Sequence, residues 1–106
     1  MDKRLENITL TSAQRKKLFE LHAEGYRYVT DNSEIPLFPL SFWAKEPSRS
    51  RIKEKNGECY YVWGYQDEDV HKEGTLMSLP AYKFDIEALH GKTKTHPILL
   101  LDLLRC

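Results

Sequence analysis

The chain has 106 residues, which is enough for one hydrophobic core and too few for a second, so we expect a single domain over residues 1–106. Its 16 basic and 16 acidic residues cancel, which excludes a whole-molecule field that would attract nucleic acid or anionic lipid. The charged start does not resemble a signal peptide, and no apolar run is long enough to span a bilayer. We therefore expect a cytoplasmic protein without a membrane partner.

The first strong pattern is a helix over residues 12–24, which follows a polar leader over residues 1–8 that we expect to fray. Thr11 and Gln14 have the spacing of a capping box, and Gly25 supplies the stop. A narrow apolar stripe along this helix predicts that one side packs on a sheet.

Two extended segments follow the helix. Residues 26–30 alternate aromatic or β-branched residues with polar ones, which predicts a first strand. Residues 35–43 are strongly apolar, but Pro36 and Pro39 lack the N–H that a sheet needs, which predicts an edge strand or an extended cover over the core. The side chains that we expect inside are Leu40, Phe42 and Trp43.

Residues 49–65 have the pattern of a β-hairpin. Asn56-Gly57 fits a two-residue type I′ turn, in which both residues take positive φ angles and the register of the two strands is fixed. The predicted cross-strand partners are Lys55 with Glu58, Lys53 with Tyr60, Arg51 with Val62 and Arg49 with Gly64.

This register predicts two different faces, because side chains on one face recur every second residue. One face is basic with a single aromatic residue, and it consists of Arg49, Arg51, Lys53, Lys55 and Tyr60. The other face is largely apolar, is expected to sink into the interior, and consists of Ile52, Cys59, Tyr61, Trp63 and Tyr65.

The rest of the chain adds a loop, a strand and a helix. Residues 66–74 are too charged to bury and predict a surface loop, residues 75–79 predict a short strand, and residues 97–104 predict a short buried helix that begins at Pro97.

Together these patterns predict an α+β fold: a twisted antiparallel sheet of three to four strands, with an N-terminal helix and a short C-terminal helix on one face. The order of the strands stays open. Residues 97–104 could belong to the core or to a dimer seam, so a monomer and a homodimer are both possible.

No catalytic or cofactor-binding motif stands out, so we expect a protein that is not an enzyme and that binds neither a cofactor nor a metal. Gly91-Lys92-Thr93 has the last letters of a phosphate loop but lacks its earlier glycine, which favours a turn. The acidic run 67–69 is more typical of a solvated loop than of a metal site, because hard cations need several ordered oxygen ligands. A Cys59 nucleophile with a histidine base stays an alternative that sequence order cannot test.

The basic face of the hairpin has two explanations. Cations at every second residue can follow a phosphate backbone, and Tyr60 can stack on a base, as in proteins that bind single-stranded nucleic acid. Lysine and arginine on an exposed strand also prevent edge-to-edge association, which requires no ligand. We give the second explanation more weight.

Residues 10–30 combine a helix that opens with Leu10-Thr11-x-x-Gln14 and an end at Gly25-Tyr26-Arg27-Tyr28 before a sheet. This order of features resembles that of small uncharacterised proteins of phages and prophages of Gram-positive bacteria. The proline-containing segment 35–43 and the long basic hairpin depart from that pattern.

The resemblance implies a non-catalytic protein that acts stoichiometrically on a host or phage protein or ribonucleoprotein in the host cell, for instance as a counter-defence (anti-CRISPR-like) inhibitor. The basic hairpin face would anchor to an acidic patch or to RNA. A second candidate surface would mimic phosphates, and it is the acidic loop of Asp67, Glu68, Asp69 and Glu73. The alternative function is direct binding of single-stranded nucleic acid by the hairpin 49–65.

Overall fold

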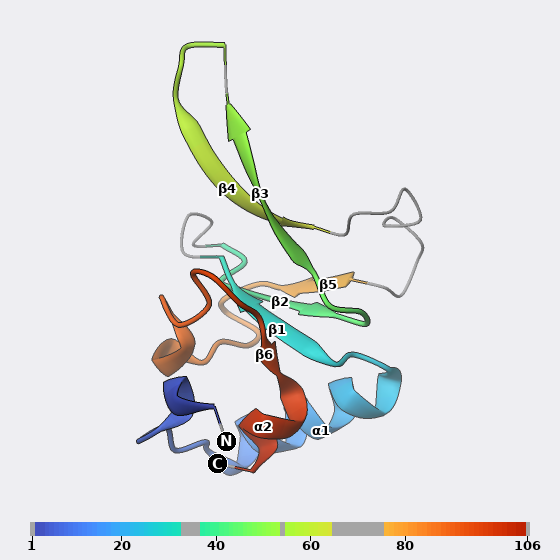
Figure 1. Cartoon of the computed structure of the whole chain (residues 1–106). Coiled ribbons are helices and arrows are strands. Elements are labelled where there is room, and N and C mark those ends of the chain that lie inside the picture. The colour runs from blue at the N-terminus through green and yellow to red at the C-terminus, as the bar shows by residue number, and fades with distance from the viewer. Residues whose placement is uncertain (1, 33–36, 54, 65–75, 106) are drawn as a thin grey trace.

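The computed structural model describes residues 2–32, 37–53, 55–64 and 76–105. It confirms the predicted α+β class, with an N-terminal helix, a four-stranded antiparallel sheet, a separate hairpin and a short C-terminal helix (Figure 1). The elements are η1 (Lys3–Leu5), α1 (Ser12–Glu24), β1 (Tyr28–Asp31), β2 (Leu40–Trp43), β3 (Ser48–Lys53), β4 (Cys59–Gly64), β5 (Leu76–Leu79), η3 (Glu87–Leu89), β6 (Ile98–Leu99) and α2 (Leu100–Leu104).

Helix α1 begins and ends as its sequence predicts. The Thr11 hydroxyl accepts a hydrogen bond from the Gln14 N–H at 3.1 Å, and the Gln14 side chain accepts one from the Thr11 N–H at 2.8 Å. Gly25 ends the helix with a φ of 113°, a left-handed conformation that costs glycine little. The capping box and the glycine stop are therefore both confirmed.

The sheet has the order β5-β2-β1-β6, and all its neighbours are antiparallel. Strand β2 is central, so the predicted edge strand over residues 35–43 is wrong in its position. The reason is that β2 begins only at Leu40, after both prolines, so neither proline interrupts the ladder. The expected burial of Leu40, Phe42 and Trp43 is confirmed.

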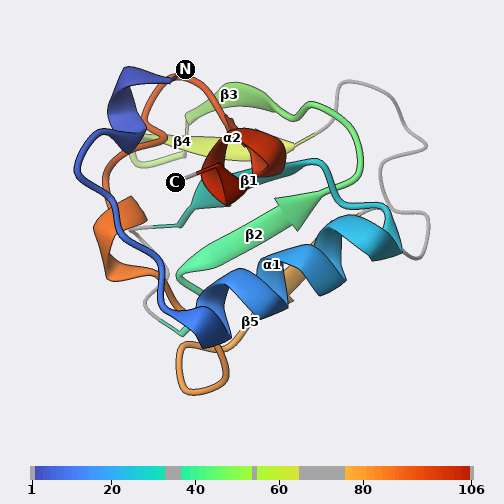
Figure 2. The same ribbon diagram turned by 90° about the horizontal axis from the view of Figure 1, so that it is seen from below.

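Helices α1 and α2 lie on the same face of the sheet (Figure 2) and pack against each other. The core under them contains Leu18 and Leu21 of α1, Val29 of β1 and Phe42 of β2, all essentially inaccessible to solvent. This is the sheet face that the apolar stripe of α1 was expected to cover.

The C-terminal tail belongs to the core, with one difference from the prediction. Pro97 does not begin a helix; the next two residues first pair with β1 as β6, and α2 follows. Leu100, Leu103 and Leu104 are buried, whereas Leu101 remains about half exposed at 47%. The tail therefore belongs to the core, while Leu99 and Leu101 stay partly exposed, and the choice between monomer and homodimer stays a prediction.

The N-terminal segment is packed, so the expected frayed leader is wrong for residues 2–8. Leu5 in η1 is 2% exposed and belongs to the core cluster, and Ile8 packs against that cluster. Burial of these two apolar side chains fixes the segment on the body. In the described part of the chain, no helix is both long and apolar enough to cross a membrane.

The opposite face of the sheet is partly polar. The Trp43 indole N–H donates to the Thr30 hydroxyl at 2.9 Å, and the Ser41 and Ser78 hydroxyls are 2.8 Å apart across β2 and β5. Trp43, Thr30 and Ser41 are all buried, so these contacts satisfy polar groups that water does not reach. The hairpin leaves the body on this side, away from the helices (Figure 1).

Candidate interaction site

Strands β3 and β4 form a two-stranded sheet of their own, which extends away from the body (Figure 1). We call this hairpin, residues 48–64, the arm. Because it projects, the molecule is elongated, with principal extents of 45 × 29 × 28 Å. The expectation that Trp63 sinks into the core is wrong: its side chain is only half-buried, because the arm stands off the main sheet.

The register of the arm differs by one residue from the prediction. Arg49 pairs with Trp63, Arg51 with Tyr61, Ile52 with Tyr60 and Lys53 with Cys59. The predicted register had paired Lys53 with Tyr60 and Arg49 with Gly64. The arginine positions of β3 therefore lie opposite the aromatic positions Tyr61 and Trp63 of β4, and Tyr60 is removed from the row of cations.

The turn explains the shift. Among the described turn residues 55–58, Gly57 has a positive φ, at 87°, and Asn56 does not, so Asn56-Gly57 does not form a type I′ turn. Asn56 instead uses its side chain, whose Oδ1 accepts the Glu58 N–H at 3.0 Å. Five residues, 54–58, connect the last paired positions, and this longer connection moves the register by one.

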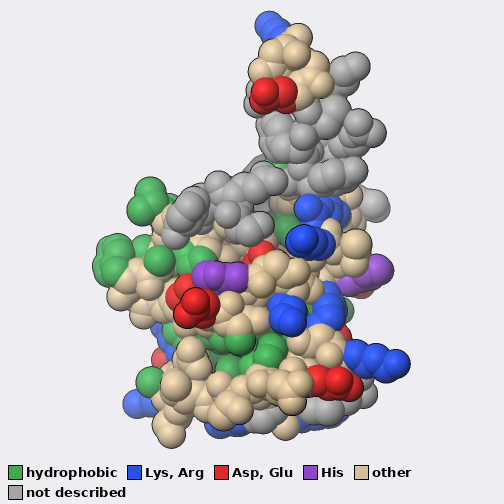
Figure 3. All heavy atoms as spheres, turned by 90° about the vertical axis from the view of Figure 1, so that its left-hand side faces the viewer, with side chains coloured by type: hydrophobic (Ala, Val, Ile, Leu, Met, Phe, Trp, Pro, Cys, Tyr) green, Lys and Arg blue, Asp and Glu red, His purple; other side chains and the backbone are tan. Residues whose placement is uncertain are grey.

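The described residues at the tip of the arm, from Lys55 to Glu58, are exposed. Figure 3 shows the arm standing above the body with basic and acidic side chains at its tip, where Lys55 and Glu58 are the charged residues. A turn of polar and charged residues at this distance from the core can contact a partner without disturbing the fold.

Arg49 lies at the root of the arm. Its guanidinium carbon is 5.7 Å from the centre of the Trp63 ring, within the range of a cation–π interaction, and its Nη1 donates to the Thr93 carbonyl at 3.5 Å. Thr93 belongs to the body. Arg49 therefore joins the arm to the body and differs from Lys55, which lies at the exposed tip.

The other predicted surface residues fall into two groups. Arg51, Lys53 and Tyr60 lie in the paired strands, and their side chains lie outside the described part of the structure. The acidic loop of Asp67, Glu68, Asp69 and Glu73 lies wholly outside the described residues. The structure therefore aligns the backbone positions of Arg49, Arg51 and Lys53 along β3 without Tyr60, and phosphate mimicry by the acidic loop stays a prediction.

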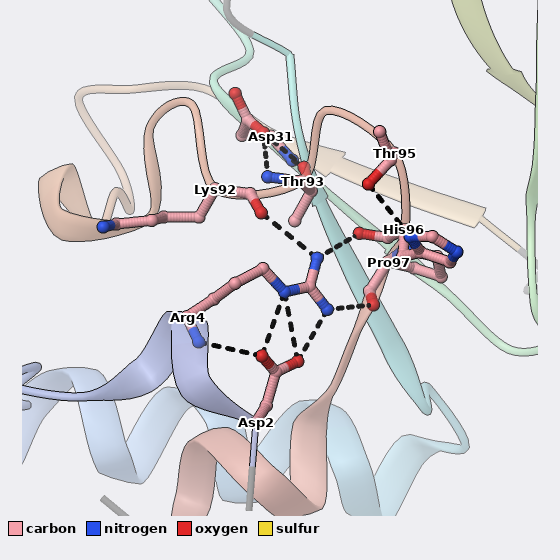
Figure 4. A network of polar contacts seen from close by, with 8 residues as sticks. All are labelled: Asp2, Arg4, Asp31, Lys92, Thr93, Thr95, His96 and Pro97. Carbon is pink, nitrogen blue, oxygen red and sulfur yellow. Dashed lines mark hydrogen bonds and ion pairs between the residues drawn. The ribbon is translucent and has the colours of Figure 1, made fainter.

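The segment 91–97 is a site that sequence reasoning missed, and its first anchor is Arg4 (Figure 4). The Arg4 guanidinium donates to three main-chain carbonyls, those of Lys92 at 3.1 Å, His96 at 2.5 Å and Pro97 at 2.9 Å. The same guanidinium forms an ion pair with the Asp2 carboxylate, with an Nη2–Oδ2 distance of 2.6 Å. Nothing in the sequence signals these contacts, because they join residues about ninety positions apart.

Asp2 is itself affected by this arrangement. The hydrogen bond from the Arg4 side chain lowers the pKa of the Asp2 carboxyl below its ordinary value, and partial burial opposes the shift without reversing it. The carboxylate therefore stays ionised beside the guanidinium.

The second anchor of the segment is Asp31, a buried carboxylate at the end of β1. It accepts the N–H of Gly91 at 2.9 Å and of Thr93 at 3.1 Å, together with the Thr93 hydroxyl. The Asp31 N–H donates back to the Thr93 hydroxyl at 2.7 Å. Gly91 has a φ of 79°, so the predicted turn at Gly91-Lys92-Thr93 is confirmed. This turn directs two N–H groups to the Asp31 carboxylate.

Among the described residues, no group of three or more His, Cys, Asp or Glu side chains is arranged to hold a metal ion. His90 and Asp85 form a surface pair at 2.8 Å, and the Asp85 carboxylate also accepts the Ile86 N–H. Cys59 lies in β4 opposite Lys53. The alternative of a Cys59 nucleophile with a histidine base stays a prediction.

The sequence matches no family model, and neither the curated proteins nor the solved structures include one that it matches.

Proposed function

We propose that this chain is a non-catalytic binding protein that contacts a macromolecule through its β3–β4 arm. The observation that carries the proposal is the separation of the arm from the core: it is a sheet of its own, it projects from the body, and its tip is exposed. A two-stranded hairpin alone is marginally stable in water. Its attachment to a folded body keeps the hairpin formed and available for contact with a partner, which supports a role in binding.

The charge of the arm supports an acidic or phosphate-bearing partner. In sequence it carries Arg49, Arg51, Lys53 and Lys55 against Glu54 and Glu58, whereas the whole chain has no net charge. Such a local positive potential steers association with a negative surface. The resemblance of residues 10–30 to phage proteins adds the proposal that this partner is a host or phage protein or ribonucleoprotein in the host cytoplasm, and that the chain acts as a stoichiometric counter-defence inhibitor.

One observation favours the second candidate function, direct binding of single-stranded nucleic acid. The register places arginine opposite an aromatic residue at two successive like-facing positions, Arg49 with Trp63 and Arg51 with Tyr61. Alternating cations and aromatic rings is the arrangement that holds backbone phosphates and stacks bases. In the predicted register the two arginines faced Val62 and Gly64, and the cation opposite an aromatic residue was Lys53, paired with Tyr60.

Matched charge variants test both candidates. Arg51→Ala with Lys53→Ala removes two charges from the arm, and Lys16→Ala with Lys83→Ala removes two from exposed positions of the body. With a fluorescein-labelled oligothymidylate, anisotropy titrations over a series of salt concentrations should show the arm variant losing about 0.7 of log–log salt slope per phosphate contact. The body variant should keep the wild-type slope.

Oligonucleotide binding and the retention of host proteins together separate the two candidates. If the wild-type protein leaves the oligonucleotide free even at low salt, the nucleic-acid candidate fails. The partner candidate then requires that immobilised wild-type protein retain a defined set of host proteins, and that the arm variant lose them while the body variant keeps them. Equal retention by the two variants would contradict any role for the arm.

A further inference from the structure

We infer that the segment 91–97 sets the direction of the arm, and that Arg4, at the opposite end of the sequence, is a positioning residue for it. The inference concerns the geometry of the arm. Its meaning for binding rests on the proposed function, whereas its test does not.

Anchors from three parts of the chain meet on this segment. Arg4 of η1 holds the carbonyls of Lys92, His96 and Pro97, and Asp31 of β1 holds the N–H groups of Gly91 and Thr93 (Figure 4). The third anchor is Arg49 of β3, which donates to the Thr93 carbonyl. Thr93 is therefore held on its N–H and hydroxyl by the sheet and on its carbonyl by the arm.

The segment depends on these anchors because it has no ladder of its own. Residues 91–97 belong to no helix or strand. Hydrogen bonds to ionised groups are the stronger kind, and both Arg4 and Asp31 supply several of them. Loss of the Arg4 contacts would free the Lys92 and His96 carbonyls on either side of the point where Arg49 binds.

A shift of the segment 91–97 is expected to move the arm, because the root of the arm is bonded to this segment. Strands β3 and β4 pair with each other and, among the described strands, with no other. Arg49 connects to the body through Thr93 and to the other strand of the arm through the Trp63 ring. A shift of the segment can therefore reach both strands of the arm through the Arg49 side chain.

The test uses the whole protein labelled with ¹⁵N and follows backbone amide resonances and hydrogen exchange. Arg4→Met removes the guanidinium and keeps an unbranched apolar side chain. Arg105→Met is the matched control, because Arg105 also pairs with an aspartate, Asp102 at 3.8 Å, and is an exposed surface cation.

Arg4→Met is expected to speed exchange of the Gly91 and Thr93 amides by about tenfold or more, and to move the resonances of Arg49 and Trp63. The β1–β2 amides should keep their wild-type shifts, and Arg105→Met should leave all of these unchanged. A variant in which the amides of residues 91–97 change while those of Arg49 and Trp63 stay at their wild-type positions would overturn the inference.

A second pair of variants keeps the inference testable if Arg4→Met does not fold. Arg4→Lys retains the cation but cannot reach three carbonyls from one planar group, so it should give the same changes at smaller amplitude. Arg49→Met cuts the connection on the arm side, so the effect of either Arg4 variant on Trp63 should vanish in that background. Persistence of that effect without Arg49 would show that the coupling does not run through this residue.

These readouts need no partner, so the two proposals fail separately. Coupled resonances together with equal binding by the arm and body charge variants would leave the positioning role intact and remove the proposed function. The reverse pattern would leave the arm as a binding element whose direction does not depend on Arg4.

Discussion

The body and the arm of this molecule differ in how much of each is buried and in how each is held. The body buries its central strands on both faces, with helices on one side and hydrogen-bonded hydroxyls on the other. The arm is one hairpin whose described tip is exposed and whose root contacts the body through Arg49, which donates to the Thr93 carbonyl. We therefore expect the body to supply most of the stability and the arm to tolerate substitutions at little cost to the fold.

The largest effect should follow from opening the centre of the body. Phe42 in β2 is fully buried, and its ring lies 6.1 Å from that of Phe84. Phe42→Ala should lower the free energy of unfolding by about 3–5 kcal/mol, because it leaves a cavity in the core. Urea denaturation measures this change. Lys55→Ala at the tip of the arm is the control, and a loss there of similar size would contradict the division of roles.

The next effect should come from the clamp between the body and the segment 91–97. Thr93→Val keeps the shape of the side chain and removes the hydroxyl that exchanges hydrogen bonds with Asp31. The buried Asp31 N–H and carboxylate each lose a partner, so unfolding should become about 1–3 kcal/mol easier. Thr95→Val changes an exposed threonine of the same segment and should be close to neutral in the same urea titration.

A smaller and purely local effect is expected at the turn of the arm. Gly57 has a positive φ, so Gly57→Ala should cost roughly 1 kcal/mol of hairpin stability, whereas Gly57→Asn should cost less. Hydrogen exchange of the β3 and β4 amides should accelerate in the alanine variant. The melting temperature of the body should stay unchanged, and a drop in it would mean that arm and body unfold as one unit.

The smallest effect should be seen in the pH dependence of stability. The pKa of Asp2 is lower in the folded chain than its ordinary value of 3.8, so its ionised form stabilises the fold above that pH. This contribution is lost as the pH falls from that value through the folded pKa. Asp2→Asn should therefore be less stable than wild type at neutral pH, with the difference shrinking below about pH 4. A constant difference down to pH 2 would contradict the shift.

Local sequence signals predicted the parts of this fold that are determined locally. Thr11, Gln14 and Gly25 define a helix through contacts within one turn, and the structure has them as expected. The turn at Asn56-Gly57 was harder, because the same dipeptide suits a two-residue type I′ turn and a longer loop with one glycine at positive φ. The one-residue difference changed which residues face the cations of β3.

Contacts distant in sequence could not be predicted. Arg4 looked like part of a frayed leader, since its partners lie about ninety residues away and are main-chain carbonyls that carry no residue-specific pattern. Asp31 lies one residue beyond the predicted strand 26–30, but it ends β1 and accepts hydrogen bonds from the Gly91 and Thr93 N–H groups. The central place of β2 followed from pairing with β5, which two nearby prolines concealed.

Native-state hydrogen exchange in low concentrations of urea tests the separation of body and arm most directly. Amides of Val29 and Phe42 should exchange only through global unfolding, with rates that rise steeply with urea. Amides of Ser50 and Val62 in the arm should exchange faster through local opening that is insensitive to urea. If all four amides share one rate and one urea dependence, the arm unfolds only with the core, and its role as a separately held binding element is contradicted.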